Sequence, residues 1–429
     1  MLPPEVLNNY AVLLLRDKRL AEAVSAFNEA LDNVEKLLEK GNKADNRVKA
    51  LRHTIRFNLA CCHDDANRIG DATDLLKQLI KDEPGYIDAY MRLAYLARKR
   101  GDMKRALDYI EQAKSKHNKD PNHSLPTKLY CMKGKFLQEM GNNQEAFAEY
   151  SKALEMSGKR DSYARVGIAN IQYATSVLQR SNVNKQEDSL RQAMKQYFTI
   201  LDTDENNCAG ALGIANVLTE YGKVDEAKEI YKLLSTSEPE SEIGLHAMVN
   251  QAHLLMDEAS REHAINLYQA ALEHQPDNLQ IAMYLCKAFY KQKDFQRCKA
   301  MTVKLLAKHP NDVRLRYNLA HCLYQKANQT LALPSRRVKQ TKEAIADLQA
   351  AKSIFSQFLE MNDQTSGQPS MFLLPSNSNK EALHLVDTMY REMYRAAEEG
   401  MAYMEQTLRN CEYFLIHDQD RENEELKQQ

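Results

Sequence analysis

The sequence is poor in glycine and proline and contains no tryptophan. Its 429 residues include only 14 Gly and 11 Pro. Sheet-based folds need many tight turns built from these two residues, so their scarcity argues against all-β and α/β folds. Ala, Leu, Lys, Glu and Gln are abundant instead, and all five favour helices. The composition predicts a long, almost entirely helical chain.

An excess of one charge and long apolar runs are also missing. Lys plus Arg number 58 and Asp plus Glu number 59, a formal net charge of -1. This balance predicts no direct contact with nucleic acid. No stretch approaches the roughly 18 consecutive apolar residues of a membrane-spanning helix, so we expect no membrane association. The start of the chain lacks a secretory signal, and the eight cysteines are therefore expected as reduced, mostly buried thiols.

Patterns that support catalysis or metal binding are missing as well. The chain has no phosphate-binding glycine-rich loop, no His-Glu-x-x-His and no Cys-x-x-Cys. Cys61, Cys62 and His63 are adjacent, but neighbouring helical residues point in different directions and cannot chelate one ion. The 17 methionines and 21 tyrosines fall at core spacings and are expected to pack. We predict that the chain is not an enzyme and has no cofactor and no metal site.

One pattern of three positions recurs along the chain. A small residue is followed four residues later by a larger, mostly aromatic or aliphatic one, and three residues after that by another apolar residue. The patterns begin at Ala23, Ala72, Ala106, Ala146, Ala193, Ala227, Ala264, Cys298 and Ala344. Three of the successive intervals equal 34 residues and the others are longer. This period is typical of the tetratricopeptide repeat (TPR), a helix–turn–helix unit.

The repeat predicts an all-α TPR superhelical solenoid of about nine helix–turn–helix units, followed by extra C-terminal helices. We expect the solenoid at 1–361, a linker at 362–379 and a C-terminal helical segment at 380–429. The linker prediction follows from a local excess of Ser, Asn, Gln, Pro and Gly. Polar insertions interrupt the fifth and ninth units at 178–192 and 328–342. The charged tail from Asp418 onward is expected to be a solvated helix or a frayed end.

The first helices of TPR units line a concave groove, and polar residues recur at their inward positions. The candidate partner-binding residues are Asn9, Asn58, Arg92, Asn170, Asn216, Asn250 and Asn318. Asparagine is a weak helix former, so its recurrence within helices needs a reason. Its amide can donate to and accept from the backbone of an extended peptide. It can equally bond to a neighbouring repeat. Both interpretations stay open for each residue, and the series as a whole favours a partner groove.

Several segments carry a more specific resemblance. The opening Leu-Pro-Pro-Glu-Val-Leu-Asn-Asn at 2–9 resembles the TPR scaffold subunit of the PAF complex, an RNA polymerase II-associated elongation factor. Phe-Asn-Leu-Ala at 57–60, Pro-Gly-Tyr-Ile-Asp-Ala-Tyr-Met-Arg-Leu at 84–93 and Ile-Ala-Asn-Val-Leu at 214–218 also look like that family. In that family the octapeptide is internal, so the resemblance implies a C-terminal TPR portion.

The same resemblance implies a non-catalytic scaffold in the nucleus. Its partners would be other PAF complex subunits, namely the namesake subunit and the parafibromin-type subunit, and indirectly RNA polymerase II and chromatin. Through them it would support transcription elongation and co-transcriptional histone modification. Two other interpretations remain open. The chain could be a TPR scaffold of another multiprotein machine, such as the anaphase-promoting complex or a transport particle. It could also be the TPR arm of an enzyme whose catalytic domain lies outside these residues.

Overall fold

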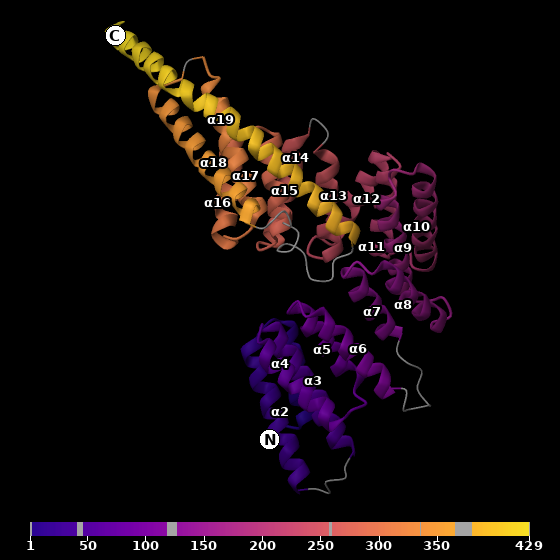
Figure 1. Cartoon of the computed structure of the whole chain (residues 1–429). Helices are drawn as coiled ribbons and strands as arrows, with labels where there is room; N and C mark the ends of the chain where they lie inside the picture. The colour runs from indigo at the N-terminus through magenta and orange to yellow at the C-terminus, as the bar shows by residue number, and fades with distance from the viewer. Residues whose placement is uncertain are drawn as a thin grey trace. The chain divides into compact units, whose positions relative to one another are not determined.

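The computed structural model describes residues 2–40, 46–117, 127–256, 260–334, 336–364 and 380–428. Every regular element in these ranges is an α-helix, and none is a strand (Figure 1). The chain packs as two compact units, Met1–Thr175 and Ser176–Gln429, which are described separately below. No helix of the described ranges is both long enough and apolar enough to cross a membrane. The all-α prediction is confirmed.

The first unit is a series of paired helices, each packed on the next from α1 to α8. The helices are α1 (Pro4–Arg16), α2 (Leu20–Lys40), α3 (Asn46–Asp65), α4 (Ile69–Asp82), α5 (Ile87–Lys99), α6 (Met103–His117), α7 (Thr127–Glu139) and α8 (Asn143–Met156). The next helix, α9 (Ser162–Leu178), runs across the boundary between the two units.

The second unit continues the same pattern, and successive helices from α10 to α19 pack together. Its helices are α10 (Val183–Thr203), α11 (Cys208–Glu220), α12 (Val224–Ser237), α13 (Glu242–Leu255), α14 (Arg261–His274), α15 (Leu279–Lys291), α16 (Phe295–Lys308), α17 (Val313–Leu331), α18 (Val338–Gln364) and α19 (Lys380–Gln428). Over the described residues, α1 to α18 make nine successive pairs, the number that the repeat predicts.

The recurring triplets form the core of both units. Each triplet lies on the second helix of its pair, and none of its members is more than 7% exposed. The small first residue lets a neighbouring helix approach closely, and the larger residue four positions later fills the space beside it. Each large apolar member contributes about 2 kcal/mol through burial of its side chain. The sequence period and the core are therefore the same feature.

Tyr150 on α8 shows how closely the helices approach. Its ring packs over glycines on the first helices before and after it, Gly134 on α7 and Gly167 on α9. A Cβ atom placed at Gly134 would lie 2.9 Å from the Tyr150 ring, and one placed at Gly167 would lie 2.5 Å from it. Glycine within a helix costs about 1 kcal/mol relative to alanine. The two glycines are explained by the space that the tyrosine ring occupies.

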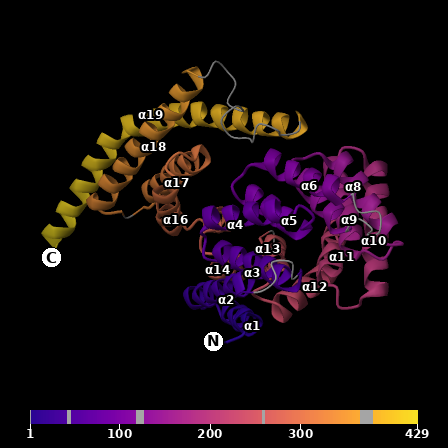
Figure 2. The same cartoon turned by 90° about the horizontal axis from the view of Figure 1, so that it is seen from below.

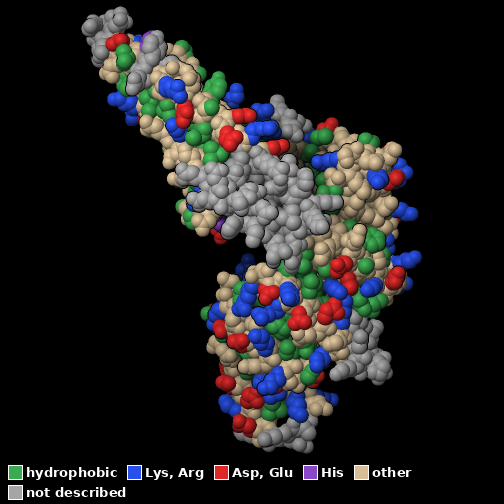
Figure 3. Space-filling model, viewed as in Figure 1, with side chains coloured by type: hydrophobic (Ala, Val, Ile, Leu, Met, Phe, Trp, Pro, Cys, Tyr) green, Lys and Arg blue, Asp and Glu red, His purple; other side chains and the backbone are tan. Residues whose placement is uncertain are grey.

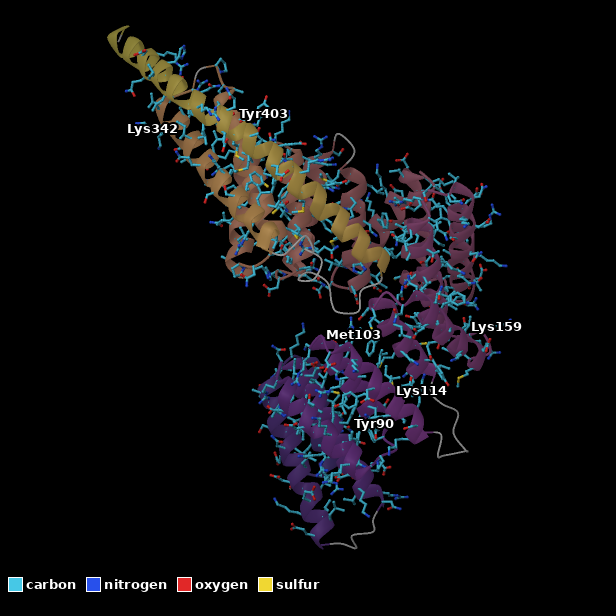
Figure 4. The ribbon with its side chains drawn as sticks, viewed as in Figure 1. Tyr90, Met103, Lys114, Lys159, Lys342 and Tyr403 are labelled. Carbon is cyan, nitrogen blue, oxygen red and sulfur yellow. The ribbon has the colours of Figure 1, made fainter. Side chains whose placement is uncertain are left out.

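The C-terminal segment is a single helix, α19, which lies along α18 in both orientations of the ribbon (Figures 1 and 2). Ala397, Met404 and Cys411 on α19 are buried against α17 and α18. Tyr403, next to Met404 in sequence and labelled in Figure 4, is 69% exposed. The predicted linker at 362–379 begins inside α18, which ends at Gln364, and residues 365–379 lie outside the described residues.

The prediction of a solvated tail is wrong at Asp418, which is fully buried. Arg336, from the insertion before α18, donates from Nε to the Asp418 carboxylate at 2.8 Å, and the Thr341 hydroxyl donates to the same oxygen. Burial opposes ionisation, but these two groups hold the pKa of Asp418 below its usual value. The ninth-unit insertion thus anchors α19 across 82 residues of sequence. Such a pair could not be recognised from a local charge pattern.

Candidate functional site

The seven candidate groove residues all lie on first helices of their pairs: Asn9 on α1, Asn58 on α3, Arg92 on α5, Asn170 on α9, Asn216 on α11, Asn250 on α13 and Asn318 on α17. The structure separates them into two groups by exposure. Asn9, Asn170 and Asn318 are exposed, whereas the other four are partly buried. Their hydrogen bonds show which of the side chains already have partners within the chain.

In the first unit, Asn58 bonds to a neighbouring repeat. Its amide nitrogen donates to the carbonyl oxygen of Asn8 at 3.0 Å, and Asn8 donates to Asn9 at 3.4 Å. Asn8 is only 7% exposed and was not among the predicted residues. The signal for it was present, because two consecutive asparagines within one helix are costly unless both are bonded. The bond between Asn58 and Asn8 connects α1 to α3, whereas the bond between Asn8 and Asn9 lies within α1.

In the second unit, Asn216 and Asn250 make the equivalent connection between α11 and α13. Asn250 donates to the Asn216 carbonyl oxygen at 2.9 Å, and the Tyr231 hydroxyl donates to the same oxygen at 2.7 Å. Tyr231 is the buried aromatic member of its triplet. Burial raises the pKa of Tyr231, so its hydroxyl stays protonated and able to donate. Both lone pairs of the Asn216 oxygen are therefore used inside the protein.

Arg92 is also held within the chain. Its guanidinium lies 2.6 Å from the carboxylate of Asp64 at the end of α3, and Lys99 donates to that carboxylate at 3.0 Å. Asp64 is 3% exposed, so its charge needs these two cations. The Arg92 side chain also lies over the ring of Tyr95. Arg92 connects α3 to α5, much as Asn58 connects α1 to α3.

Buried charge is compensated in the same way further along the first unit. Glu149 on α8 accepts from Lys114 at 3.1 Å and from Lys133 at 2.9 Å. Lys114 on α6, labelled in Figure 4, also lies 4.3 Å above the ring of Tyr130. On the face of this unit that Figure 3 shows, lysines and arginines are interspersed with aspartates and glutamates.

A cluster of aromatic and histidine side chains joins α13, α14 and α15 of the second unit, and sequence reasoning took its tyrosines first as packing residues. On α13 and α15, the His253 and Tyr284 rings meet edge to face at 4.5 Å. Tyr268 from α14 stacks on Tyr284 at 6.0 Å, and its hydroxyl lies 2.5 Å from Nδ1 of His253. Burial lowers the pKa of His253, which favours its neutral form at pH 7.

The cluster continues onto α17 and encloses a pocket. The Tyr290 hydroxyl lies 3.3 Å from Nε2 of His321, whose ring also contacts Tyr317. Between α15, α16 and α17 is a pocket of about 340 Å³, lined by Met283, Tyr284, Cys286, Lys287, Tyr290, Cys298, Asn318 and His321. Asn318 is the only predicted residue that lines it. Tyr284 stands at the repeat position where several other units carry asparagine, and that substitution was the available signal.

Metal-binding geometry is not formed in the described ranges, where no three His, Cys, Asp or Glu side chains are grouped to hold an ion. The eight cysteines are free thiols, and six of them are buried. Burial raises the pKa of the pocket-lining Cys286 to about 12, which keeps it protonated and unreactive. The pocket can therefore contact a ligand through hydrogen bonds, aromatic rings and the charge of Lys287.

Comparison with known families agrees with the repeat pattern. Two tetratricopeptide-repeat models match residues 65–125 and 127–160, and the model of the Psidin N-terminal TPR repeats region matches residues 184–317. Among solved structures, a TPR protein of Parabacteroides merdae is similar with a TM-score of 0.49 and 15% identity, covering 67% of this chain and 98% of that one. The chain is a tetratricopeptide-repeat protein.

Its relatives among curated proteins are more specific. It is 24% identical over 396 residues to the CTR9 homologue of Arabidopsis thaliana, covering 84% of this chain and 35% of that protein. It is 23% identical to the RNA polymerase-associated protein CTR9 of Caenorhabditis elegans over 92% of this chain and 34% of that protein. The yeast protein of the same name is 23% identical over 84% of this chain and 34% of its own length. The chain is therefore similar to CTR9 proteins over most of its own length, and it spans about a third of theirs.

Proposed function

We propose that this chain is the scaffold portion of a CTR9-type subunit, which holds other subunits of an RNA polymerase II-associated PAF complex together in the nucleus. The observation that carries the proposal is the similarity to CTR9 over 84–92% of the chain, since the worm and yeast relatives are named RNA polymerase-associated. In this role the chain is non-catalytic. Through its partners it supports transcription elongation and co-transcriptional histone modification. Its association with RNA polymerase II and chromatin is indirect.

The proposed partners are the namesake subunit and the parafibromin-type subunit, bound along the first helices. Polar side chains on these helices support this placement, because an exposed amide can pair with the backbone of an extended segment. The seven predicted residues do not contribute equally. Asn9 and Asn318 are exposed and lie on first helices, whereas Asn58, Asn216, Asn250 and Arg92 are bonded to neighbouring repeats. We therefore assign partner contact to the exposed residues and assign inter-repeat bonding to the others.

Co-elution with the N-terminal part of the namesake subunit tests the proposal. The tagged chain should form a complex with it on size-exclusion chromatography, and light scattering should give one copy of each. Failure to co-elute with either proposed subunit would reject the assignment. A self-dimer without them would favour a TPR scaffold of another machine.

A matched pair of variants tests where the partner binds in the first repeat. Asn9→Ala removes an exposed amide from α1, and Asn28→Ala removes one from the exposed face of α2. If the first helices carry the contact, Asn9→Ala should weaken binding about fivefold, the size expected for one hydrogen bond. Asn28→Ala should leave the affinity unchanged. Equal effects of the two variants would contradict a first-helix interface.

A further inference from the structure

We infer that the pocket between α15 and α17 binds an apolar side chain of an extended acidic peptide segment, with a carboxylate of that segment paired to Lys287. This inference rests on the proposed function and deepens it, because it gives one place on the scaffold a ligand of defined chemistry. Three features of the described residues support it: the apolar interior of the pocket, the charge at its open side and the fixed arrangement of its walls.

The interior suits one apolar side chain. Met283, Tyr290 and the buried thiols of Cys286 and Cys298 are among the lining residues, and the volume of about 340 Å³ is near the lower limit of small-ligand pockets. His321 adds a ring that is neutral at pH 7, because burial lowers its pKa. A side chain entering this space leaves water for thioether, thiol and aromatic groups. An aliphatic or aromatic residue would gain most from that transfer.

The open side of the pocket carries an uncompensated positive charge. Lys287 is exposed and is the only ionised side chain among the lining residues. Two nearby lysines already have a partner, since Lys299 and Lys326 share the carboxylate of Asp347 at 2.8 and 2.7 Å. Lys287 makes no ion pair with any other described residue. A carboxylate beside the apolar residue of a bound segment would supply the missing counter-charge.

The polar groups at the edge of the pocket suit a peptide backbone. The Asn318 side chain is exposed and makes no hydrogen bond within the described ranges, so both the donor and the acceptor of its amide are available. Tyr284, beside it, already accepts from Gln280 at 2.7 Å, which fixes the direction of its hydroxyl. Nucleic acid is the less favoured ligand, because single-strand grooves combine stacked aromatics with several cations along the phosphates. Here the lining offers one lysine.

The walls are held in place before any ligand arrives. Tyr284 is fixed between His253 and Tyr268, and Tyr290 is fixed by its contacts with His321 and with Phe295 at 5.4 Å. Side chains that are already ordered lose little conformational entropy on binding. The walls of the pocket are therefore ordered before a ligand binds.

Selection from a random peptide library displayed on phage, with the full chain as bait, tests the inference. The recovered peptides should share an aliphatic or aromatic residue with Asp or Glu next to it. A synthetic peptide of the recovered sequence should lose about tenfold in affinity when the apolar residue becomes Ala, and a similar amount when the acid becomes its amide. Recovery of peptides without acidic enrichment would overturn the inference.

A charge-reversal pair locates the binding. Lys287→Glu should weaken binding of the acidic peptide about tenfold or more. Used as bait in the same phage selection, this variant should select basic peptides instead. Lys304→Glu makes the same change on the exposed face of α16 and should bind like the unaltered chain. Equal thermal unfolding of the two variants shows that folding is intact. Equal peptide affinity of the two variants, or Lys287-dependent binding of a fluorescent oligouridine in place of the peptide, would overturn the inference.

The two proposals can fail separately. If the namesake subunit co-elutes with the chain but no acidic peptide depends on Lys287, the peptide pocket is wrong and the scaffold assignment stands. If the acidic peptide binds in a Lys287-dependent manner but neither proposed subunit co-elutes, the pocket stands and its natural ligand belongs to a different complex.

Discussion

The first helices near the start of the chain and those near α15 and α17 use the same repeat positions in different ways. At the start, Asn58 is bonded to Asn8, and Arg92 is bonded to the buried Asp64. At α15 and α17, the equivalent positions hold Tyr284 and Asn318, beside a pocket and the unpaired Lys287. A polar residue on a first helix is therefore no proof of a binding groove. Whether its hydrogen bonds are already satisfied by the next repeat decides its role.

The largest loss of stability should follow removal of a buried carboxylate near the start of the chain. Asp64→Ala removes the buried carboxylate that pairs with both Arg92 and Lys99, and we expect the free energy of unfolding to fall by about 3 kcal/mol. Asp65→Ala is the matched control. Asp65 is 54% exposed, and its carboxylate lies 3.7 Å from the Arg92 guanidinium, farther than that of Asp64. This change should lower the free energy of unfolding by about 0.5 kcal/mol or less. Urea unfolding followed by circular dichroism measures both, and equal losses would remove the distinction between these charges.

A smaller loss is expected from the amide connection in the second unit. Asn216→Ala deprives both Asn250 and Tyr231 of their acceptor and should lower the free energy of unfolding by about 2 kcal/mol. Asn318→Ala should change it by about 0.5 kcal/mol or less, because Asn318 is exposed and bonds to no described residue. The same urea titration distinguishes them. A larger loss for Asn318→Ala would reverse the roles given to the two residues.

The smallest effect concerns pH. Burial lowers the pKa of His253, so between that lowered value and about 6.5 the unfolded chain binds more protons than the folded one. Stability contributed by this group is thus present above about pH 6.5 and is lost as pH falls through the window. His253→Gln should flatten the decline in unfolding free energy between neutral and mildly acidic pH. His246→Gln, an exposed change on the same helix, should leave the decline as it is.

The core could be predicted from the sequence, and the partners of polar side chains could not. The triplets beginning at Ala23 and its eight counterparts are all buried, since small and large residues at fixed helical spacing leave few other ways to pack. Asn58 and Asn318 occupy the same repeat position, yet only Asn58 finds an acceptor, which is 50 residues away. Asp418 is buried by Arg336, 82 residues away. Such pairings depend on three-dimensional neighbours that the local pattern does not contain.

The central claim is that the first helices α15 and α17 present the partner-binding groups, whereas the neighbouring second helices α14 and α16 do not contact the partner. Hydrogen exchange measured by mass spectrometry on the chain with and without the namesake subunit tests this claim most directly. We predict that the partner slows exchange in α13, α15 and α17 and leaves α14 and α16 unchanged. Slower exchange confined to α14 and α16, or no change in any of these helices in a complex that has formed, would contradict the account.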